Sequence, residues 1–153
     1  MSEIALACDH AGFVLKEHIK SHLAKKGVPY EDFGTFNSDP VDYPDFAYKA
    51  ADAVQKGNCK TGILVCGTGI GVAITANKLK GIRAALCFDR FSASCARRHN
   101  DANILTLGAR VLEKRLALEI VDVFLETNFE GGRHLERIKK IAELEEKNFL
   151  GET

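Results

Sequence analysis

Short apolar runs alternate with longer segments of helical periodicity along the chain, and this alternation constrains the fold more than any other feature. The predicted strands are residues 3–8, 30–33, 62–66, 83–87 and 104–107. The predicted helices are residues 13–26, 45–55, the segment from the Gly-rich turn to about residue 79, and residues 91–99, 113–126 and 133–147. Strands that alternate with helices pair in parallel through right-handed crossovers.

The expected fold is therefore a Rossmann-like three-layer αβα sandwich with a roughly five-stranded parallel sheet. A chain of 153 residues is long enough for one ordinary domain with a buried core, and we assign residues 1–153 to a single domain. Residues 35–44, which include two prolines, are expected to form a loop before the second helix.

One edge of the predicted sheet gathers most of the reactive side chains, because ligands of such sheets bind beyond the carboxyl ends of the strands. Four strands are followed there by Cys8-Asp9-His10, Cys66-Gly67-Thr68-Gly69, Cys87-Phe88-Asp89 and Leu107-Gly108-Ala109-Arg110. Topology alone thus brings an acid, a histidine, a thiol, a glycine turn and an arginine together. This edge is the predicted functional site.

The glycine turn Gly67-Thr68-Gly69-Ile70-Gly71 matches nucleotide-binding patterns poorly. The dinucleotide fingerprint needs a third glycine where this chain has Val72, although Asp89 lies near the spacing of the ribose-binding acid. The turn also follows the third predicted strand, and the phosphate-loop Gly-Lys-Ser/Thr step is absent. A nucleotide-binding regulatory module remains an alternative. The backbone N–H groups equally suit another anion, such as the oxygen of an enolate.

Cys66 is the cysteine whose position suggests chemistry. A role as small buried side chains suffices for Cys8, Cys59, Cys87 and Cys95. Cys66 ends a predicted strand just before a helix, whose positive N-terminal end stabilises a thiolate. A thiolate there can act as base or nucleophile, and a purely structural cysteine remains an equally open interpretation.

The histidines occupy three kinds of position, which differ in how strongly they suggest a function. His18 and His22 lie four residues apart on one predicted helix, but no third ligand accompanies them, so we expect a boundary pair and no metal site. His10 lies at the predicted functional edge beside Asp9. His99 stands at a helix end, where a structural role is the simpler reading.

Arg133 and Arg137 are four residues apart and share one face of the last predicted helix, next to His134. A solvated basic face is the plainer explanation. Two guanidinium groups just after Gly131-Gly132 also have the arrangement that grips a phosphate. The apolar face of this helix could pack on its own domain or on a partner subunit.

Charge and apolar content exclude several partner classes. Lys plus Arg number 21 and Asp plus Glu number 21, so no net charge favours nucleic acid or anionic lipid. No apolar stretch approaches the roughly 18 residues that span a membrane. The five cysteines form no C-x-x-C pair and the N-terminal segment does not resemble a secretory signal. We expect a cytoplasmic protein with reduced thiols.

Seven motifs together resemble the type B ribose-5-phosphate isomerases. They are CDHAG at 8–12, DYPDFA at 42–47, CGTGIG at 66–71, ANKLKGIRAAL at 76–86, RRHNDANI at 97–104, LGARV at 107–111 and EGGRH at 130–134. The resemblance covers nearly the whole chain in the same order. The wider family includes galactose-6-phosphate isomerase subunits, which are similar in the glycine turn and lack the His-Asn pair seen here at 99–100.

The resemblance implies a cofactor-free aldose–ketose isomerase and a role for each matching position. Cys66 would move a proton between C1 and C2, and His99, helped by Asp9, would open the sugar ring. One branch of the family uses a glutamate just after the turn, where this chain has Val72. The enediolate would be bound by the turn residues Gly67, Thr68, Gly69, Ile70 and Gly71. The phosphate would be bound by His10, Arg110, Arg133 and Arg137, and the sugar would be positioned by Tyr43 and Asn100.

The resemblance also implies assembly. Members are homodimers, sometimes paired into tetramers, with sites between subunits, so His99 and the last helix, about residues 133–147, are expected at the dimer interface. Three alternatives remain: an isomerase of allose 6-phosphate, galactose 6-phosphate or a tetrose phosphate, the nucleotide-binding module, and a purely structural α/β subunit.

Overall fold

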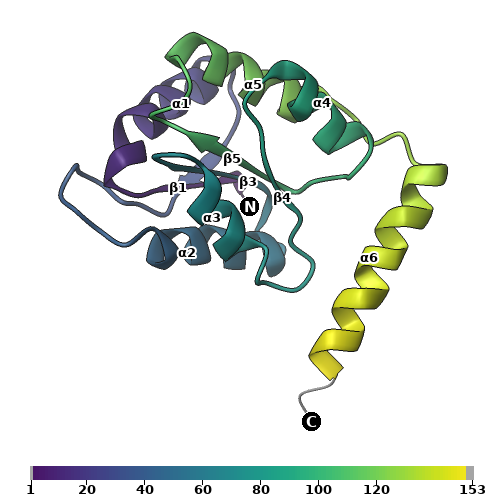
Figure 1. The fold of residues 1–153 in the computed structure, drawn as a ribbon. Coiled ribbons are helices and arrows are strands. Elements are labelled where there is room, and N and C mark those ends of the chain that lie inside the picture. The colour runs from purple at the N-terminus through teal and green to yellow at the C-terminus, as the bar shows by residue number, and fades with distance from the viewer. Residues whose placement is uncertain (1, 151–153) are drawn as a thin grey trace.

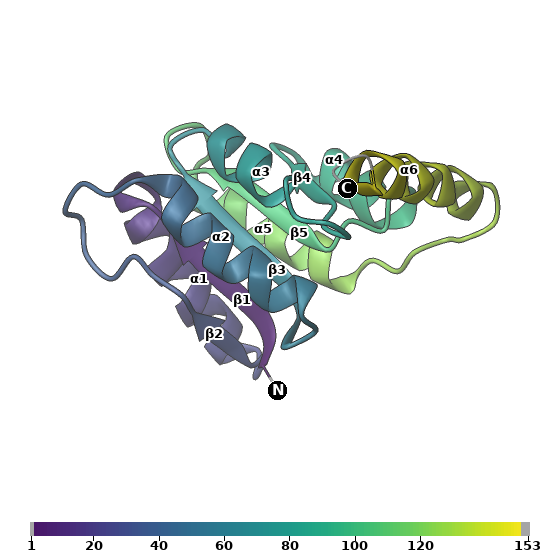
Figure 2. The same ribbon diagram turned by 90° about the horizontal axis from the view of Figure 1, so that it is seen from below.

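The computed structural model describes residues 2–150 and contains a five-stranded, all-parallel sheet covered by helices on both faces (Figures 1 and 2). This confirms the predicted fold class. The strands lie in the order β2-β1-β3-β5-β4. Met1 and residues 151–153, which the predicted domain includes, lie outside the described residues.

The elements follow the predicted alternation. The strands are β1 (Ser2–Cys8), β2 (Tyr30–Asp32), β3 (Cys59–Cys66), β4 (Ala84–Leu86) and β5 (Ile104–Gly108). The helices are a short 3-10 turn (His10–Gly12), α1 (Phe13–Lys25), α2 (Tyr43–Gln55), α3 (Ile70–Ala76), α4 (Arg90–Arg98), α5 (Lys114–Glu126) and α6 (Arg133–Leu150).

Two apolar cores lie on opposite faces of the sheet, because side chains alternate between the faces along each strand. In β1, Ile4 and Leu6 pack with α1, α4 and α5, whereas Ala5 and Ala7 pack with α2 and α3. The second core is rich in alanine on both the strand and the α2 side, and small side chains let α2 approach the sheet closely.

Two helix ends differ from the prediction for local reasons. Helix α2 begins at Tyr43 and not at residue 45, because Pro44 fits the first turn, where a backbone N–H has no partner to lose. Helix α3 ends at Ala76 and not near residue 79. The side chain of Asn77 instead pairs with the backbone of Ala84 through two hydrogen bonds of 2.8 and 3.0 Å, which turns the chain toward β4.

A buried lysine links α1 to the end of β2. Lys16 is fully buried, and its Nζ donates to Asp32 Oδ1 at 2.6 Å and to the backbone oxygen of Thr35 at 2.5 Å. Burial raises the pKa of Asp32, but hydrogen bonds from Lys16, Gly34 and Lys20 outweigh it and hold this pKa below its ordinary value. This pair fixes the start of the loop that leads to α2.

Replacing Asp32 by asparagine is expected to lower the free energy of unfolding by about 3–5 kcal/mol at neutral pH, because it leaves the buried ammonium of Lys16 without its counter-ion. The lowered pKa makes this contribution fully present above the unfolded-state pKa and lost as the pH falls through the lower folded-state value. Urea denaturation from pH 7 to pH 3 measures both effects. The exposed control Asp39→Asn should change stability by less than about 0.5 kcal/mol. Equal stability of the two variants at pH 7 would contradict this account.

Helix α6 extends away from the layers of the sandwich (Figure 1). It contacts the turn after α3, where Glu145 accepts hydrogen bonds from the backbone of Gly81 and Glu146 pairs with Lys80. Much of its predicted apolar face stays exposed within one chain, as shown by Leu135, Ile141 and Leu144. None of the helices among residues 2–150 is both long and apolar enough to cross a membrane.

Candidate active site

The predicted edge of the sheet holds an open cavity of about 380 Å³ around Cys66. It is lined by Asp9, Tyr43, Cys66, Gly67, Thr68, Ile70, Gly71, Ile74 and Arg110. Every lining residue except Ile74 was predicted. The carboxyl ends of β1, β3 and β5 meet here, and Tyr43 was expected from the family resemblance. A larger depression of about 980 Å³ lies over α2, but none of the predicted catalytic side chains lines it.

The sulfur of Cys66 receives a hydrogen bond from the glycine turn. Cys66 is 4% exposed, and the backbone N–H of Gly69 donates to its Sγ at 3.2 Å. Gly69 has φ +80°, and a side-chain carbon there would lie 2.6 Å from Leu86 Cδ1, so the turn requires glycine. An amide donor at this distance is the kind of contact that stabilises a thiolate.

Thr106 anchors the glycine turn to β5, and this role was not predicted. Its buried hydroxyl donates to the backbone oxygen of Gly69 at 2.9 Å, which ties the middle of β5 to the turn. The backbone N–H groups of Ala109 and Arg110 donate to Cys66 and Gly67. The signal was present in the sequence, because Thr106 is the polar residue of an otherwise apolar strand.

Two side chains lie directly against the glycine turn. A side-chain carbon at Gly71 would lie 2.6 Å from the ring of Tyr43, so the ring rests directly on the backbone. A carbon at Gly67 would lie 3.1 Å from Arg110 Nη1, which places the guanidinium group against the turn as well. The glycines therefore let an aromatic ring and a cation approach the anion-binding backbone closely.

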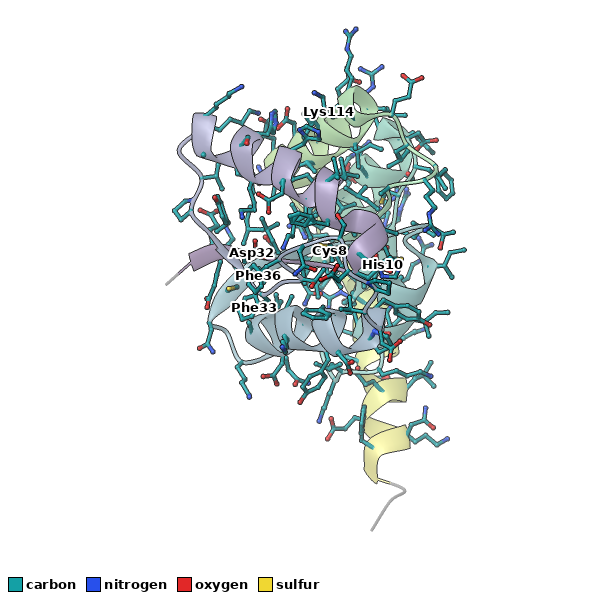
Figure 3. All side chains as sticks on the ribbon, turned by 90° about the vertical axis from the view of Figure 1, so that its left-hand side faces the viewer. Cys8, His10, Asp32, Phe33, Phe36 and Lys114 are labelled. Carbon is teal, nitrogen blue, oxygen red and sulfur yellow. The ribbon has the colours of Figure 1, made fainter. Side chains whose placement is uncertain are left out.

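The acid and histidine after β1 are held by backbone contacts, and His10 lies between α1 above and α2 below in Figure 3. Asp9 is 7% exposed, and its Oδ1 accepts from the N–H of Gly12 at 3.1 Å. His10 Nδ1 accepts from the N–H of Val41 at 3.1 Å, which leaves Nε2 as the donor of the neutral ring. His10 does not line the cavity itself.

Four predicted residues lie away from this cavity within one chain: His99, Asn100, Arg133 and Arg137. Helix α4 connects the carboxyl end of β4 to the amino end of β5, and its nine residues span about 13 Å. His99 therefore lies toward the amino ends of the strands, opposite the end that holds Cys66. The backbone oxygen of Asn100 confirms this placement, since it accepts from Arg83 just before β4.

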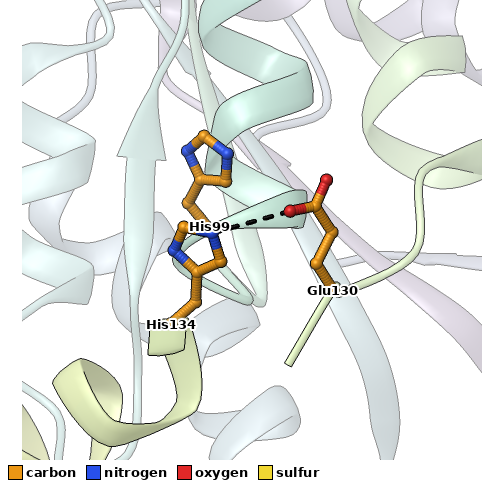
Figure 4. Close-up of side chains that lie close together, drawn as sticks. All are labelled: His99, Glu130 and His134. Atoms are coloured by element: carbon orange, nitrogen blue, oxygen red, sulfur yellow. Dashed lines mark ion pairs between the residues drawn. The ribbon is translucent and has the colours of Figure 1, made fainter. Parts of the chain in front are cut away.

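His99 lies instead against the start of α6 (Figure 4). Its ring stacks on that of His134 with centroids 4.3 Å apart and an interplanar angle of 12°. Glu130 Oε2 lies 3.5 Å from His134 Nε2. Partial burial, followed by the neighbouring His99 and Arg133, lowers the pKa of His134, against the opposing effect of Glu130.

The grouping of His99, Glu130 and His134 has the composition of a metal site, with potential ligand atoms within 4.8 Å of one another. A metal bond to imidazole lies near the plane of the ring. Because these two rings lie face to face, their nitrogen lone pairs run in nearly parallel planes and do not converge on one point. The observed arrangement therefore fits a stacked pair better than a metal centre.

Several cysteine, histidine and aspartate side chains outside the cavity serve structural roles. Burial raises the pKa of the Cys8 thiol to about 12 and that of Cys87 to about 11, so both stay protonated near neutral pH. His22 pairs with Asp122 at 2.7 Å. Asp89 accepts from the N–H of Ser92 at 2.6 Å and caps α4, which removes the main support for a ribose-binding role.

Comparison with known proteins identifies the family. The Ribose/Galactose Isomerase family model matches residues 4–141. The chain belongs to the ribose/galactose isomerase family. Ribose-5-phosphate isomerase B of Escherichia coli (strain K12) is 47% identical over 147 residues, which cover 96% of this chain and 99% of that protein.

Solved structures of the family share the same fold. Clostridium thermocellum ribose-5-phosphate isomerase B has a TM-score of 0.94 at 51% identity, covering 95% of this chain and 99% of that one. The Mycoplasma genitalium ribose-5-phosphate isomerase B, which was solved with bound ribulose 5-phosphate, has a TM-score of 0.91 at 46% identity, covering 94% and 96%. The cavity at Cys66 is thus the candidate active site of a ribose/galactose isomerase family member.

Proposed function

We propose that this protein interconverts ribose 5-phosphate and ribulose 5-phosphate, with Cys66 as the proton-transfer base. The observation that carries the proposal is the thiol of Cys66 in the edge cavity, 3.2 Å from the N–H of Gly69. Family membership supports it, together with a relative solved with bound ribulose 5-phosphate.

In the proposed reaction, the Cys66 thiolate removes the proton from C2 of the open-chain aldose. The electrons of the C2–H bond form the C1–C2 double bond, and those of the aldehyde move onto O1. The resulting enediolate oxygen is stabilised by N–H groups of the turn, with Thr68 beside them. The thiol then returns its proton to C1, while the hydroxyl proton on O2 moves to O1 and leaves the ketone at C2.

The remaining predicted residues prepare the substrate. His99, with Asp9, opens the furanose ring that ribose 5-phosphate mostly adopts. His10, Arg110, Arg133 and Arg137 bind the phosphate, which arginine does well because its planar fork matches phosphate oxygens. Tyr43 and Asn100 position the sugar. None of these steps transfers a hydride, so the proposal requires neither a nicotinamide cofactor nor a metal.

We assign the complete site to two subunits of a homodimer, or of a tetramer built from such dimers. Within one chain, Cys66 ends β3 at the carboxyl ends of the strands, whereas His99 follows α4 toward their amino ends, so one polypeptide does not bring the base and the ring-opening group together. The exposed apolar face of α6 supports this assembly, because a second subunit can bury it and bring His99, Arg133 and Arg137 to its neighbour's cavity.

Purified protein is expected to convert ribose 5-phosphate with a kcat/KM at least about tenfold above those for allose 6-phosphate, galactose 6-phosphate and erythrose 4-phosphate. An extra or missing carbon shifts the reacting atoms relative to a fixed phosphate grip, which costs about one to two orders of magnitude. Rates measured with and without EDTA should agree. A higher kcat/KM for a six-carbon or four-carbon sugar would replace the proposed substrate while keeping the reaction class.

A further inference from the structure

His134 occupies a position that the reaction as proposed leaves without a task. It is the second residue of α6 and is only 7% exposed, whereas Arg133 and Arg137 on either side of it are exposed. Its ring faces the ring of His99 at 4.3 Å and is nearly parallel to it. The side chain is therefore directed at the imidazole of His99 and not at solvent, where the neighbouring guanidinium groups lie.

The support of His134 continues into the helix that carries His99. Glu130 lies 3.5 Å from His134 Nε2, and its other oxygen accepts from Arg98 Nε at 2.5 Å. The backbone N–H of Glu130 also donates to the backbone oxygen of Arg98 at 3.1 Å. A chain of contacts thus links Arg98, the last residue of α4, to Glu130 in the loop before α6. It continues from Glu130 to His134, whose ring lies on the face of the His99 ring.

His99 needs such support because of where it stands. It is the C-terminal cap of α4, and its own backbone is held by one helical hydrogen bond, from its N–H to Cys95. A half-buried imidazole at a helix end would otherwise sample several staggered rotamers. A stacked ring on one face leaves the edge of the His99 imidazole, which carries both nitrogens, free to reach a substrate.

We propose that His134 is a positioning residue that holds the imidazole of His99 in the orientation required to open the furanose ring. This inference rests on the proposed function. It assigns His134 to the ring-opening step alone, separate from the proton transfer at Cys66 and from the phosphate grip of Arg133 and Arg137.

The chemistry of the two sugars separates these steps. Ribose 5-phosphate closes to a furanose through its 4-hydroxyl, so its conversion needs ring opening. Ribulose 5-phosphate has no free 5-hydroxyl with which to form a furanose and stays open-chain. Exchange of its C1 hydrogen with D₂O therefore requires proton transfer but neither ring opening nor ring closure.

The test compares His134→Ala, His134→Phe and the unmodified enzyme in two NMR experiments, which follow the conversion of ribose 5-phosphate and the exchange of the C1 hydrogen of ribulose 5-phosphate in D₂O. In His134→Ala, conversion of ribose 5-phosphate should fall about tenfold relative to C1 exchange of ribulose 5-phosphate, because misplacing a reacting group costs one to two orders of magnitude. His134→Phe keeps a stacked ring and should restore most of the conversion. Thermal denaturation and the KM for ribulose 5-phosphate should show little change in the phenylalanine variant.

Two outcomes would overturn the inference. Conversion and exchange that fall together, with a raised KM and weaker inhibition by inorganic phosphate, would place His134 in phosphate binding. No change in the ratio of conversion to exchange would leave His134 without a role at His99. Absence of both reactions in the unmodified enzyme would instead refute the proposed function, so the two failures are distinguishable.

Discussion

Replacing Cys66 by alanine is expected to lower the turnover of ribose 5-phosphate by about 10³-fold or more. A positioned base alone contributes about 10²–10⁴-fold, and no other thiol lines the cavity. Val72, which directly follows the glycine turn, is buried and carries no carboxylate, so it offers no substitute base. Initial rates of ribulose 5-phosphate formation measure the loss.

The control for this variant is ligand binding. Inorganic phosphate should bind Cys66→Ala as it binds the unmodified enzyme, because the side chains proposed to bind phosphate are those of His10 and the arginines. Cys66→Ser is the matched variant of similar size, and its hydroxyl is too weak a base to restore the rate. Turnover above about a tenth of the original in the alanine variant would remove Cys66 from the reaction.

Mixing Cys66→Ala subunits with His99→Ala subunits is expected to restore activity that neither variant has alone. If each site takes its thiol from one subunit and its ring-opening imidazole from the other, a mixed dimer contains one site with both groups. Random exchange of a symmetric dimer then recovers about a quarter of the original sites. Steady-state rates after denaturation and joint refolding measure the recovery.

A mixture of Cys66→Ala with Cys66→Ser serves as the control, since every one of its sites lacks the thiol. Co-purification of an affinity-tagged variant with an untagged one shows that subunits have exchanged. Exchange without any recovery would mean that Cys66 and His99 meet within one chain, or not at all, and would refute the two-subunit site.

Much of the fold was predictable because local patterns and tertiary packing agree. Leu15, Ile19 and Leu23 form a stripe at four-residue spacing in the sequence, and all three are buried on one face of α1. Helix ends were less predictable from periodicity, since Pro44 acts through its missing backbone N–H and Asn77 through two side-chain hydrogen bonds to Ala84. Lys16 lies beside the same stripe and is buried, but its partners Asp32 and Thr35 approach only through the fold.

The candidate site was predictable where topology alone gathers residues. The carboxyl ends of parallel strands meet whatever their side chains are, so Asp9, Cys66 and Arg110 were expected together and line one cavity. The stack of His99 on His134 was not predicted, because it depends on where the irregular segment 127–132 places α6. No periodic pattern encodes a contact between a helix end and a separate terminal helix.

The position of the Cys66 sulfur against a bound substrate analogue tests the central claim most directly. A crystal structure with 5-phosphoribonate, whose carboxylate imitates the enediolate, should place Sγ within about 3.5 Å of C1 and C2. The same structure should show the carboxylate oxygens facing the N–H groups of the turn. A sulfur separated from both carbons by other side chains, with another basic group in contact with them, would contradict the account.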